Sequence, residues 1–129
     1  HVHNVGWQSY VEGEKQAGTT GRSLPIEALQ IKIENSSYEG KIEYCTHVSN
    51  IGWQSYVEGG KQAGTTGRLL PVEAMKIKLT GELAEHYDIY YRAHVSNIGW
   101  QNWVKNDEIA GTTGKSLPIE AVQIKLVEK

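Results

Sequence analysis

The sequence predicts an all-β domain built from three tandem repeats, and three observations support this. The heptapeptide His1–Trp7 returns as His47–Trp53 and again as His94–Trp100, at spacings of 46 and 47 residues. Over 33 aligned positions, copies one and two share 25 identities and copies two and three share 21. Segments such as Ile89–Val95 alternate apolar and polar residues and are rich in tyrosine and β-branched residues, which is typical of strands. Three equal units favour a pseudo-threefold β-prism; a β-trefoil is the alternative, and an open solenoid is a third possibility.

The third copy shows the expected strands most clearly: Tyr87–Asn97, Trp100–Lys105, a short strand near Ala110, and Ile119–Leu126. Each copy contains Gly-Thr-Thr-Gly, which we interpret as a turn whose glycines adopt positive φ. Copies two and three follow an Ile-x-Tyr strand, whereas copy one starts at His1, so repeat 1 is expected to lack one strand. We treat the 129 residues as one domain with repeats 1–46, 47–93 and 94–129.

Composition excludes several classes of partner. The net charge is -2, without the basic excess that nucleic-acid binding requires. No apolar run approaches the roughly 20 residues of a membrane span, so membrane insertion is not expected. The single cysteine cannot form an internal disulfide. No cofactor motif is present, and because the chain opens without methionine we expect it to be part of a larger multidomain protein.

Strand alternation assigns faces to the aromatic residues. Trp53, Ser55 and Val57 share one side, and Val57 indicates that this side is the core. The sequence therefore predicts that Trp7, Trp53 and Trp100 are buried anchors. The opposite face then presents an amide beside an aromatic residue in every copy, a pair that suits the hydroxyls and the apolar C–H face of a sugar. These candidate ligand-binding pairs are Gln8 with Tyr10, Gln54 with Tyr56, and Gln101 with Trp103.

Other repeated polar residues suggest secondary roles. Glu27, Glu73 and Glu120 share the inward parity of their strands, so each carboxylate needs hydrogen bonds, for which the Gly-Thr-Thr-Gly amides and hydroxyls are expected partners. His94 shares the outward parity of Arg92, which argues against three histidines converging on a metal. The turn supplies further candidate ligand-binding residues: Thr20, Thr66, Thr113, Arg22, Arg68 and Lys115.

The chain resembles the clostridial hydrophobic repeats with a conserved tryptophan, called ChW repeats. The resemblance rests on Gly99-Trp100, Gly111–Gly114 and Glu120-Ala121 with their equivalents, and it extends over nearly the whole chain in three copies. It implies secreted or surface-attached proteins of Gram-positive bacteria, and binding rather than catalysis. It defines neither a ligand nor a set of binding residues.

The expected function is a non-catalytic, lectin-like, extracellular or cell-surface module with up to three equivalent sites. Its expected partner is a glycan, either host mucin-type or cell-wall polysaccharide. The alternative is a protein–protein interaction or spacer module. An enzyme is not expected, because one glutamate in each of three equivalent units provides no asymmetric acid/base pair.

Overall fold

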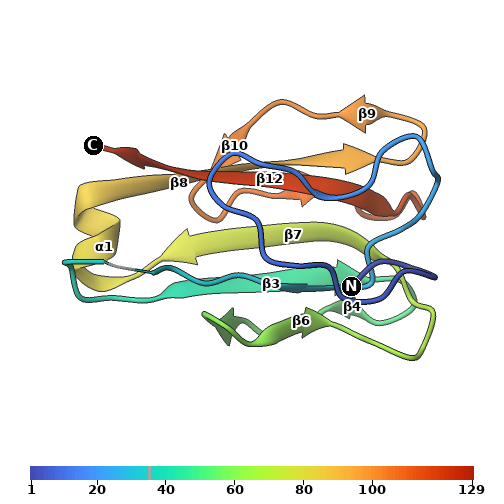
Figure 1. The fold of residues 1–129 in the computed structure, drawn as a ribbon, viewed down its shortest axis with the longest axis horizontal. Coiled ribbons are helices and arrows are strands. Elements are labelled where there is room, and N and C mark those ends of the chain that lie inside the picture. The colour runs from blue at the N-terminus through green and yellow to red at the C-terminus, as the bar shows by residue number, and fades with distance from the viewer. Residues whose placement is uncertain (35) are drawn as a thin grey trace.

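A computed structural model describes residues 1–34 and 36–129, and it confirms the all-β class (Figure 1). Within these residues, repeat 1 contributes two short strands, β1 (Ala17–Gly18) and β2 (Ala28–Gln30). Repeat 2 contributes β3 (Ile42–Val48), β4 (Gly52–Trp53), β5 (Val57–Glu58), β6 (Gln62–Gly64) and β7 (Val72–Leu79). Repeat 3 contributes β8 (Tyr87–Val95), β9 (Gly99–Trp100), β10 (Val104–Lys105), β11 (Ala110–Gly111) and β12 (Ile119–Glu128).

Two long antiparallel pairs, β3 with β7 and β8 with β12, run along the long axis of the molecule (Figure 1). The six-residue helix α1 (Gly81–His86) connects β7 to β8 at one end. β3 and β8 cross the divisions at residues 46/47 and 93/94, so structurally each leading strand belongs to the repeat that follows it. No helix in the described part of the chain is long and apolar enough to cross a membrane.

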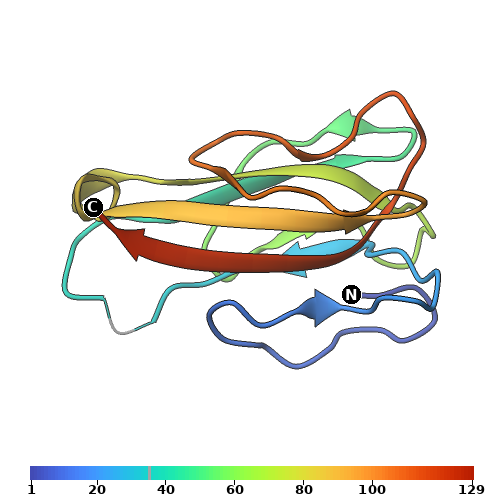
Figure 2. The same ribbon diagram turned by 90° about the horizontal axis from the view of Figure 1, so that it is seen from above.

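The repeats exchange short strands in a closed cycle. β6 of repeat 2 pairs with β2 of repeat 1, and β11 of repeat 3 pairs with β7 of repeat 2. β1 of repeat 1 completes the cycle by pairing with β12 of repeat 3, which brings the two ends of the repeat array side by side (Figure 2). The three repeats are thus linked in a ring rather than in an open line. The distinction between prism and trefoil stays a prediction.

The first glycine of each Gly-Thr-Thr-Gly makes this exchange possible. Gly64 has a φ of +91°, and a Cβ added there would lie 2.4 Å from the carbonyl oxygen of Glu27. A side chain is therefore excluded by the neighbouring strand as well as disfavoured by the backbone conformation. Gly18 and Gly111 make the same close approach to Glu120 and Glu73.

Tyrosine and aliphatic side chains fill the core between the sheets. Tyr44 of β3 and Tyr91 of β8 are among the largest fully buried side chains. The Tyr91 hydroxyl accepts a hydrogen bond from Ile77 N–H at 3.1 Å and donates to the carbonyl of Glu108. The Tyr44 hydroxyl likewise accepts a hydrogen bond from Ile31 N–H and donates one to the carbonyl of Lys61. Each leading strand thereby connects its own repeat to the preceding one.

Candidate functional site

The tryptophans that recur in the three repeats lie on the outer surface, so the prediction that they anchor the core is wrong. Trp7 is 47% exposed, Trp53 is 37% exposed, and Trp100 is half-buried. The reason is a one-residue irregularity between β4 and β5. Trp53 pairs with His47, and Val57 pairs with Tyr44. The chain therefore advances four residues from Trp53 to Val57 while the partner strand β3 advances only three, from His47 to Tyr44. The extra residue inverts the side-chain alternation, and Val57 therefore faces the core while Trp53 faces outward.

Each exposed tryptophan packs against the histidine directly opposite it. His47 and Trp53 are cross-strand partners, and their rings meet edge to face with centroids 5.3 Å apart. His94 and Trp100 repeat this geometry at 5.3 Å. In repeat 1 the distance from His1 to Trp7 is 5.5 Å. Edge-to-face contact is a favourable arrangement for aromatic rings, so it restricts the orientation of the exposed indole.

A buried glutamate lies beside each of these histidines. Nδ1 of His47 is hydrogen-bonded to Oε1 of Glu73 at 3.1 Å, and His94 is bonded to Glu120 at the same distance. In repeat 1, Glu27 is hydrogen-bonded to His3, while His1 lies 3.1 Å from the same carboxylate without a hydrogen bond. The predicted burial of these three glutamates is confirmed. The prediction that the Gly-Thr-Thr-Gly amides and hydroxyls bond to these carboxylates is wrong. The turn amides bond to the main-chain carbonyls of the glutamates, and the carboxylates bond to histidine.

That main-chain contact places the turn of one repeat beside the glutamate of another. Thr65 N–H donates to the carbonyl of Glu27 at 3.0 Å, and Thr112 N–H donates to that of Glu73 at 3.0 Å. Thr19 N–H completes the cycle on Glu120 at 3.1 Å. Each His–Trp face, defined by the histidine, tryptophan and glutamate of one repeat, therefore borders a turn that a neighbouring repeat supplies.

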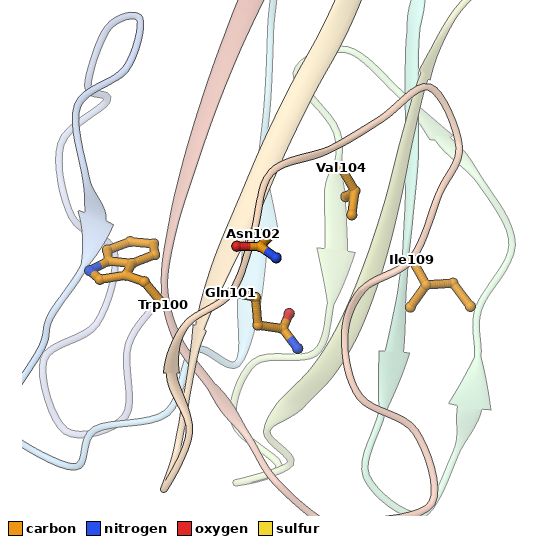
Figure 3. A pocket seen from close by; sticks show the side chains of 5 residues that line it. All are labelled: Trp100, Gln101, Asn102, Val104 and Ile109. Carbon is orange, nitrogen blue, oxygen red and sulfur yellow. The ribbon is translucent and has the colours of Figure 1, made fainter.

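The predicted glutamines have a structural contact. Gln101 Oε1 accepts the Gly111 N–H at 2.7 Å, Gln54 accepts that of Gly64 at 2.9 Å, and Gln8 accepts that of Gly18 at 3.0 Å. Gln101 also lines an open pocket of about 440 Å³ together with Trp100, Asn102, Val104 and Ile109. In Figure 3 the Trp100 indole points away from Val104 and Ile109. The predicted amide and the tryptophan of repeat 3 therefore border the same pocket.

The second aromatic residue of each repeat lies near the tryptophan and is covered by cations. The guanidinium of Arg92 lies 4.8 Å from the Trp100 ring and 4.9 Å from the Trp103 ring. In repeat 2, the ammonium of Lys76 lies 4.6 Å from Trp53 and 5.8 Å from Tyr56. Tyr56 and Trp103 are half-buried beneath these cations.

Repeat 1 leaves its second aromatic residue more open. Tyr10 is 54% exposed, and its hydroxyl donates to Gln30 at 3.0 Å. Lys32 lies 4.2 Å from the ring centroid. The ligand-binding roles predicted for Tyr10, Tyr56 and Trp103 stay predictions. In repeats 2 and 3 a shared cation places the second aromatic residue and the tryptophan on one outward surface.

Desolvation raises the pKa of Tyr56 above its usual range, and its hydrogen bond to Asp107 adds to the effect. This hydroxyl is therefore neutral at ordinary pH and acts as a hydrogen-bond donor. Tyr56 thereby links repeat 2 to Asp107 of repeat 3.

The predicted loop residues are all exposed, namely Thr20, Thr66, Thr113, Arg22, Arg68 and Lys115. The hydroxyls that the structure buries are those of the preceding threonines, Thr19, Thr65 and Thr112, for which no protein partner is found among the described residues. Within that same part of the chain, no group of three or more His, Cys, Asp or Glu side chains could hold a metal ion.

Sequence reasoning missed an exposed aliphatic residue two positions before each tryptophan. Val5 is 46% exposed, Ile51 is 42% exposed and Ile98 is 50% exposed. The preceding asparagine has a φ of 67° at Asn50 and Asn97, which places the aliphatic residue just after a tight turn. The signal was available, because an apolar residue between a turn-forming Asn and Gly at a hairpin tip has no access to the core.

Comparison with known proteins identifies the repeat. No curated protein and no solved structure matches the chain. The family model described as Clostridial hydrophobic W (ChW) matches three times, at residues 1–35, 47–81 and 94–128. These matches begin at the three histidines and include the tryptophan, the Gly-Thr-Thr-Gly turn and the buried glutamate of every copy. The chain therefore belongs to the Clostridial hydrophobic W family, of which it contains three tandem repeats.

Proposed function

We propose that the chain is a non-catalytic binding module of a secreted or cell-surface protein, and that it binds carbohydrate through its three His–Trp faces. The observation that supports this is the tryptophan that recurs on the outer surface of every repeat, exposed in repeats 1 and 2 and half-buried in repeat 3. In repeats 2 and 3 a histidine that is hydrogen-bonded to a buried glutamate orients this tryptophan. The core does not require an exposed indole, and neither does strand pairing. Repeated exposure of a large apolar ring in a fixed orientation favours an interaction role.

The chemistry around the ring suits a sugar. An indole covers the apolar C–H face of a pyranose, and the Nε2 atom of each histidine is the ring nitrogen not engaged with glutamate. Lys76 and Arg92 bring positive charge to the rings of repeats 2 and 3. The class of ligand is a host mucin-type glycan or a bacterial cell-wall polysaccharide, and the cations favour anionic members of either class.

Three equivalent sites change the expected binding behaviour. A repeating polymer can engage several faces at once, so weak individual sites give strong overall attachment. A glycoside hydrolase uses two carboxylates on either side of one bond, and a single buried glutamate in each repeat does not favour that reaction.

A protein ligand is the second candidate, and the exposed aliphatic residues favour it. Val5, Ile51 and Ile98 are exposed and each directly precedes the Gly-Trp of its repeat, and an aliphatic side chain beside an indole is typical of a protein-binding surface. The two candidates use overlapping surfaces but different side chains.

The experiment is a glycan array that contains mucin-type and cell-wall oligosaccharides, probed with the chain and followed by titration of any hit. The triple variant Trp7→Ala, Trp53→Ala, Trp100→Ala is expected to lose at least about tenfold in affinity while remaining folded. The matched control is Val5→Ser, Ile51→Ser, Ile98→Ser, which is expected to keep glycan binding. Unchanged affinity in the tryptophan variant would contradict the proposal. Loss in the aliphatic variant alone would favour the protein-binding alternative.

A further inference from the structure

Among residues 1–34 and 36–129, repeat 1 shows no strand equivalent to β3 of repeat 2 and β8 of repeat 3. β7 pairs with the leading strand β3, and β12 pairs with the leading strand β8. β2, the equivalent strand of repeat 1, pairs only with β6 among the described residues. The other two repeats therefore show, residue by residue, what a strand at this edge would contact.

The apolar side chains around this edge are exposed where their equivalents are covered. Leu79 at the end of β7 is 9% exposed, whereas Leu126 at the same position of β12 is 42% exposed. Val57 and Val104 pair with Tyr44 and Tyr91 of the leading strands and are half-buried. Their equivalent, Val11, is 46% exposed. Exposed apolar side chains therefore lie on both sides of this edge, Val11 in repeat 1 and Leu126 in repeat 3.

The other two repeats also show what a tyrosine at this edge would contact. Tyr44 bridges Ile31 N–H and the Lys61 carbonyl, and Tyr91 bridges Ile77 N–H and the Glu108 carbonyl. By the cyclic order of the repeats, the third pair of atoms is Ile124 N–H and the Lys15 carbonyl. No tyrosine hydroxyl in the described part of the chain bonds to either of these atoms.

The main chain at His1 already has the register that such a strand would continue. The His1 amino group donates to the Ala28 carbonyl at 2.8 Å, and Glu27 N–H donates to the His1 carbonyl at 2.8 Å. His47 and His94 occupy the same place at the ends of β3 and β8, opposite Ala74 and Ala121.

We propose that the edge of repeat 1 binds one β-strand of the repeats' own Ile-x-Tyr type, antiparallel to residues 28–33, with its tyrosine between Ile124 and Lys15. The strand pairs with repeat 1 on one side through main-chain hydrogen bonds, which supply affinity in strand addition. Its isoleucine and tyrosine cover the exposed apolar side chains of Val11 and Leu126. The Ile-x-Tyr spacing supplies specificity because both residues face the core, as Ile42 and Tyr44 do.

The test adds this strand to the chain. A copy of residues 87–93 is fused directly before His1, where Ala93 precedes His94 in the natural repeat and no linker is needed. The fusion is expected to raise the melting temperature by about 10 °C, from burial of one tyrosine and one isoleucine. Amide hydrogen exchange at Ile124 and Val11 is expected to slow by at least about tenfold.

Two matched fusions keep the test specific. In the first, the tyrosine copied from Tyr91 is alanine; in the second, the seven residues are scrambled. Both are expected to give neither the thermal shift nor the protection at Ile124. The proposal is wrong if the original fusion leaves the melting temperature and exchange unchanged, or if the scrambled extension produces the same effects.

Discussion

Nδ1 of His94 lies 3.1 Å from Oε1 of Glu120, a side chain whose residue is only 7% exposed. A histidine that donates Nδ1–H to a carboxylate presents Nε2 on its opposite side. Because the same ring meets Trp100 edge to face, the buried glutamate determines the orientation of two residues at the surface. This relationship recurs in repeat 2 between His47, Glu73 and Trp53.

Removing this carboxylate should destabilise the fold. Glu120→Ala leaves His94 without its partner and is expected to lower the free energy of unfolding by about 1–3 kcal/mol. Chemical denaturation measures the change. Glu128→Ala, at the exposed end of the same strand, is the control and should stay within about ±0.5 kcal/mol. Equal effects from both substitutions would contradict the structural role of Glu120.

Trp53 and Tyr44 should differ sharply as stability determinants. Trp53→Ala removes a side chain from the outer surface and is expected to lower unfolding free energy by about 1 kcal/mol. Tyr44→Ala removes a fully buried ring and its hydrogen bonds and should lower it by about 3–5 kcal/mol. Thermal or chemical unfolding of both variants measures the difference. A larger loss for Trp53 would restore the interpretation of tryptophan as a core anchor.

The sequence predicted the class of fold because repetition and alternation are properties of short segments. His94 and Trp100 are cross-strand partners, so their side chains lie on the same face of the sheet. Because strand alternation had placed His94 on the outward face, it was sufficient to predict that Trp100 also faces outward. The prediction instead used Val57, which lies beyond the irregularity between β4 and β5. Nothing in Gln54–Tyr56 indicates an extra residue, because irregularities of this kind depend on pairing with another strand.

The exchange of strands between repeats lay beyond sequence reasoning for a similar reason. Gly64 and Ala28 pair across repeats, and because the copies share these residues, the sequence does not indicate whether a strand pairs within its own copy or with another. The contact of Glu73 with His47 was missed because parity assigned the two residues to opposite faces. The irregularity between His47 and Val48 in the pairing with β7 brings both to the same side.

Alkaline pH should destabilise the protein through its buried tyrosines. Desolvation raises the pKa of Tyr44 and of Tyr91 above the ordinary value of 10.0. The folded state therefore retains the phenolic protons more tightly than the unfolded state. Their contribution to stability is complete below pH 10 and is lost as pH rises through the raised folded-state pKa values, by at most about 1.4 kcal/mol per pH unit for each tyrosine.

Denaturation between about pH 8 and pH 12 measures this slope. Tyr91→Phe removes one ionisable group and should flatten the alkaline decline, although it lowers stability at neutral pH because Ile77 N–H loses its acceptor. Tyr90→Phe, a half-buried neighbour, is the control. An unchanged alkaline slope in Tyr91→Phe would show that other groups control the loss.

Repeats 2 and 3 supply the cation that reaches both aromatic rings from different strands. In repeat 3, Arg92 of β8 reaches both Trp100 and Trp103 and bonds to its cross-strand partner Gln123 at 2.7 Å. In repeat 2, the position of Arg92 is Cys45, and its cross-strand partner Lys76 extends over the rings instead.

The Arg92–Gln123 pair of repeat 3 and the Cys45–Lys76 pair of repeat 2 therefore both place one cation over the tryptophan of their repeat. Lys76→Gln should remove the cation over Trp53, while Lys78 stays 4.2 Å from the Tyr56 ring. The substitution is expected to lower the free energy of unfolding by about 0.5–1 kcal/mol, the usual value of an exposed cation–π contact. The double variant Cys45→Arg, Lys76→Gln reproduces the pair of repeat 3, so it should recover that loss. Chemical denaturation measures both variants, and the tryptophan fluorescence of Trp53 reports whether a cation again covers the ring. If the double variant is less stable than Lys76→Gln alone, the surroundings of Cys45 do not accept the arginine and the two repeats are not interchangeable at this position.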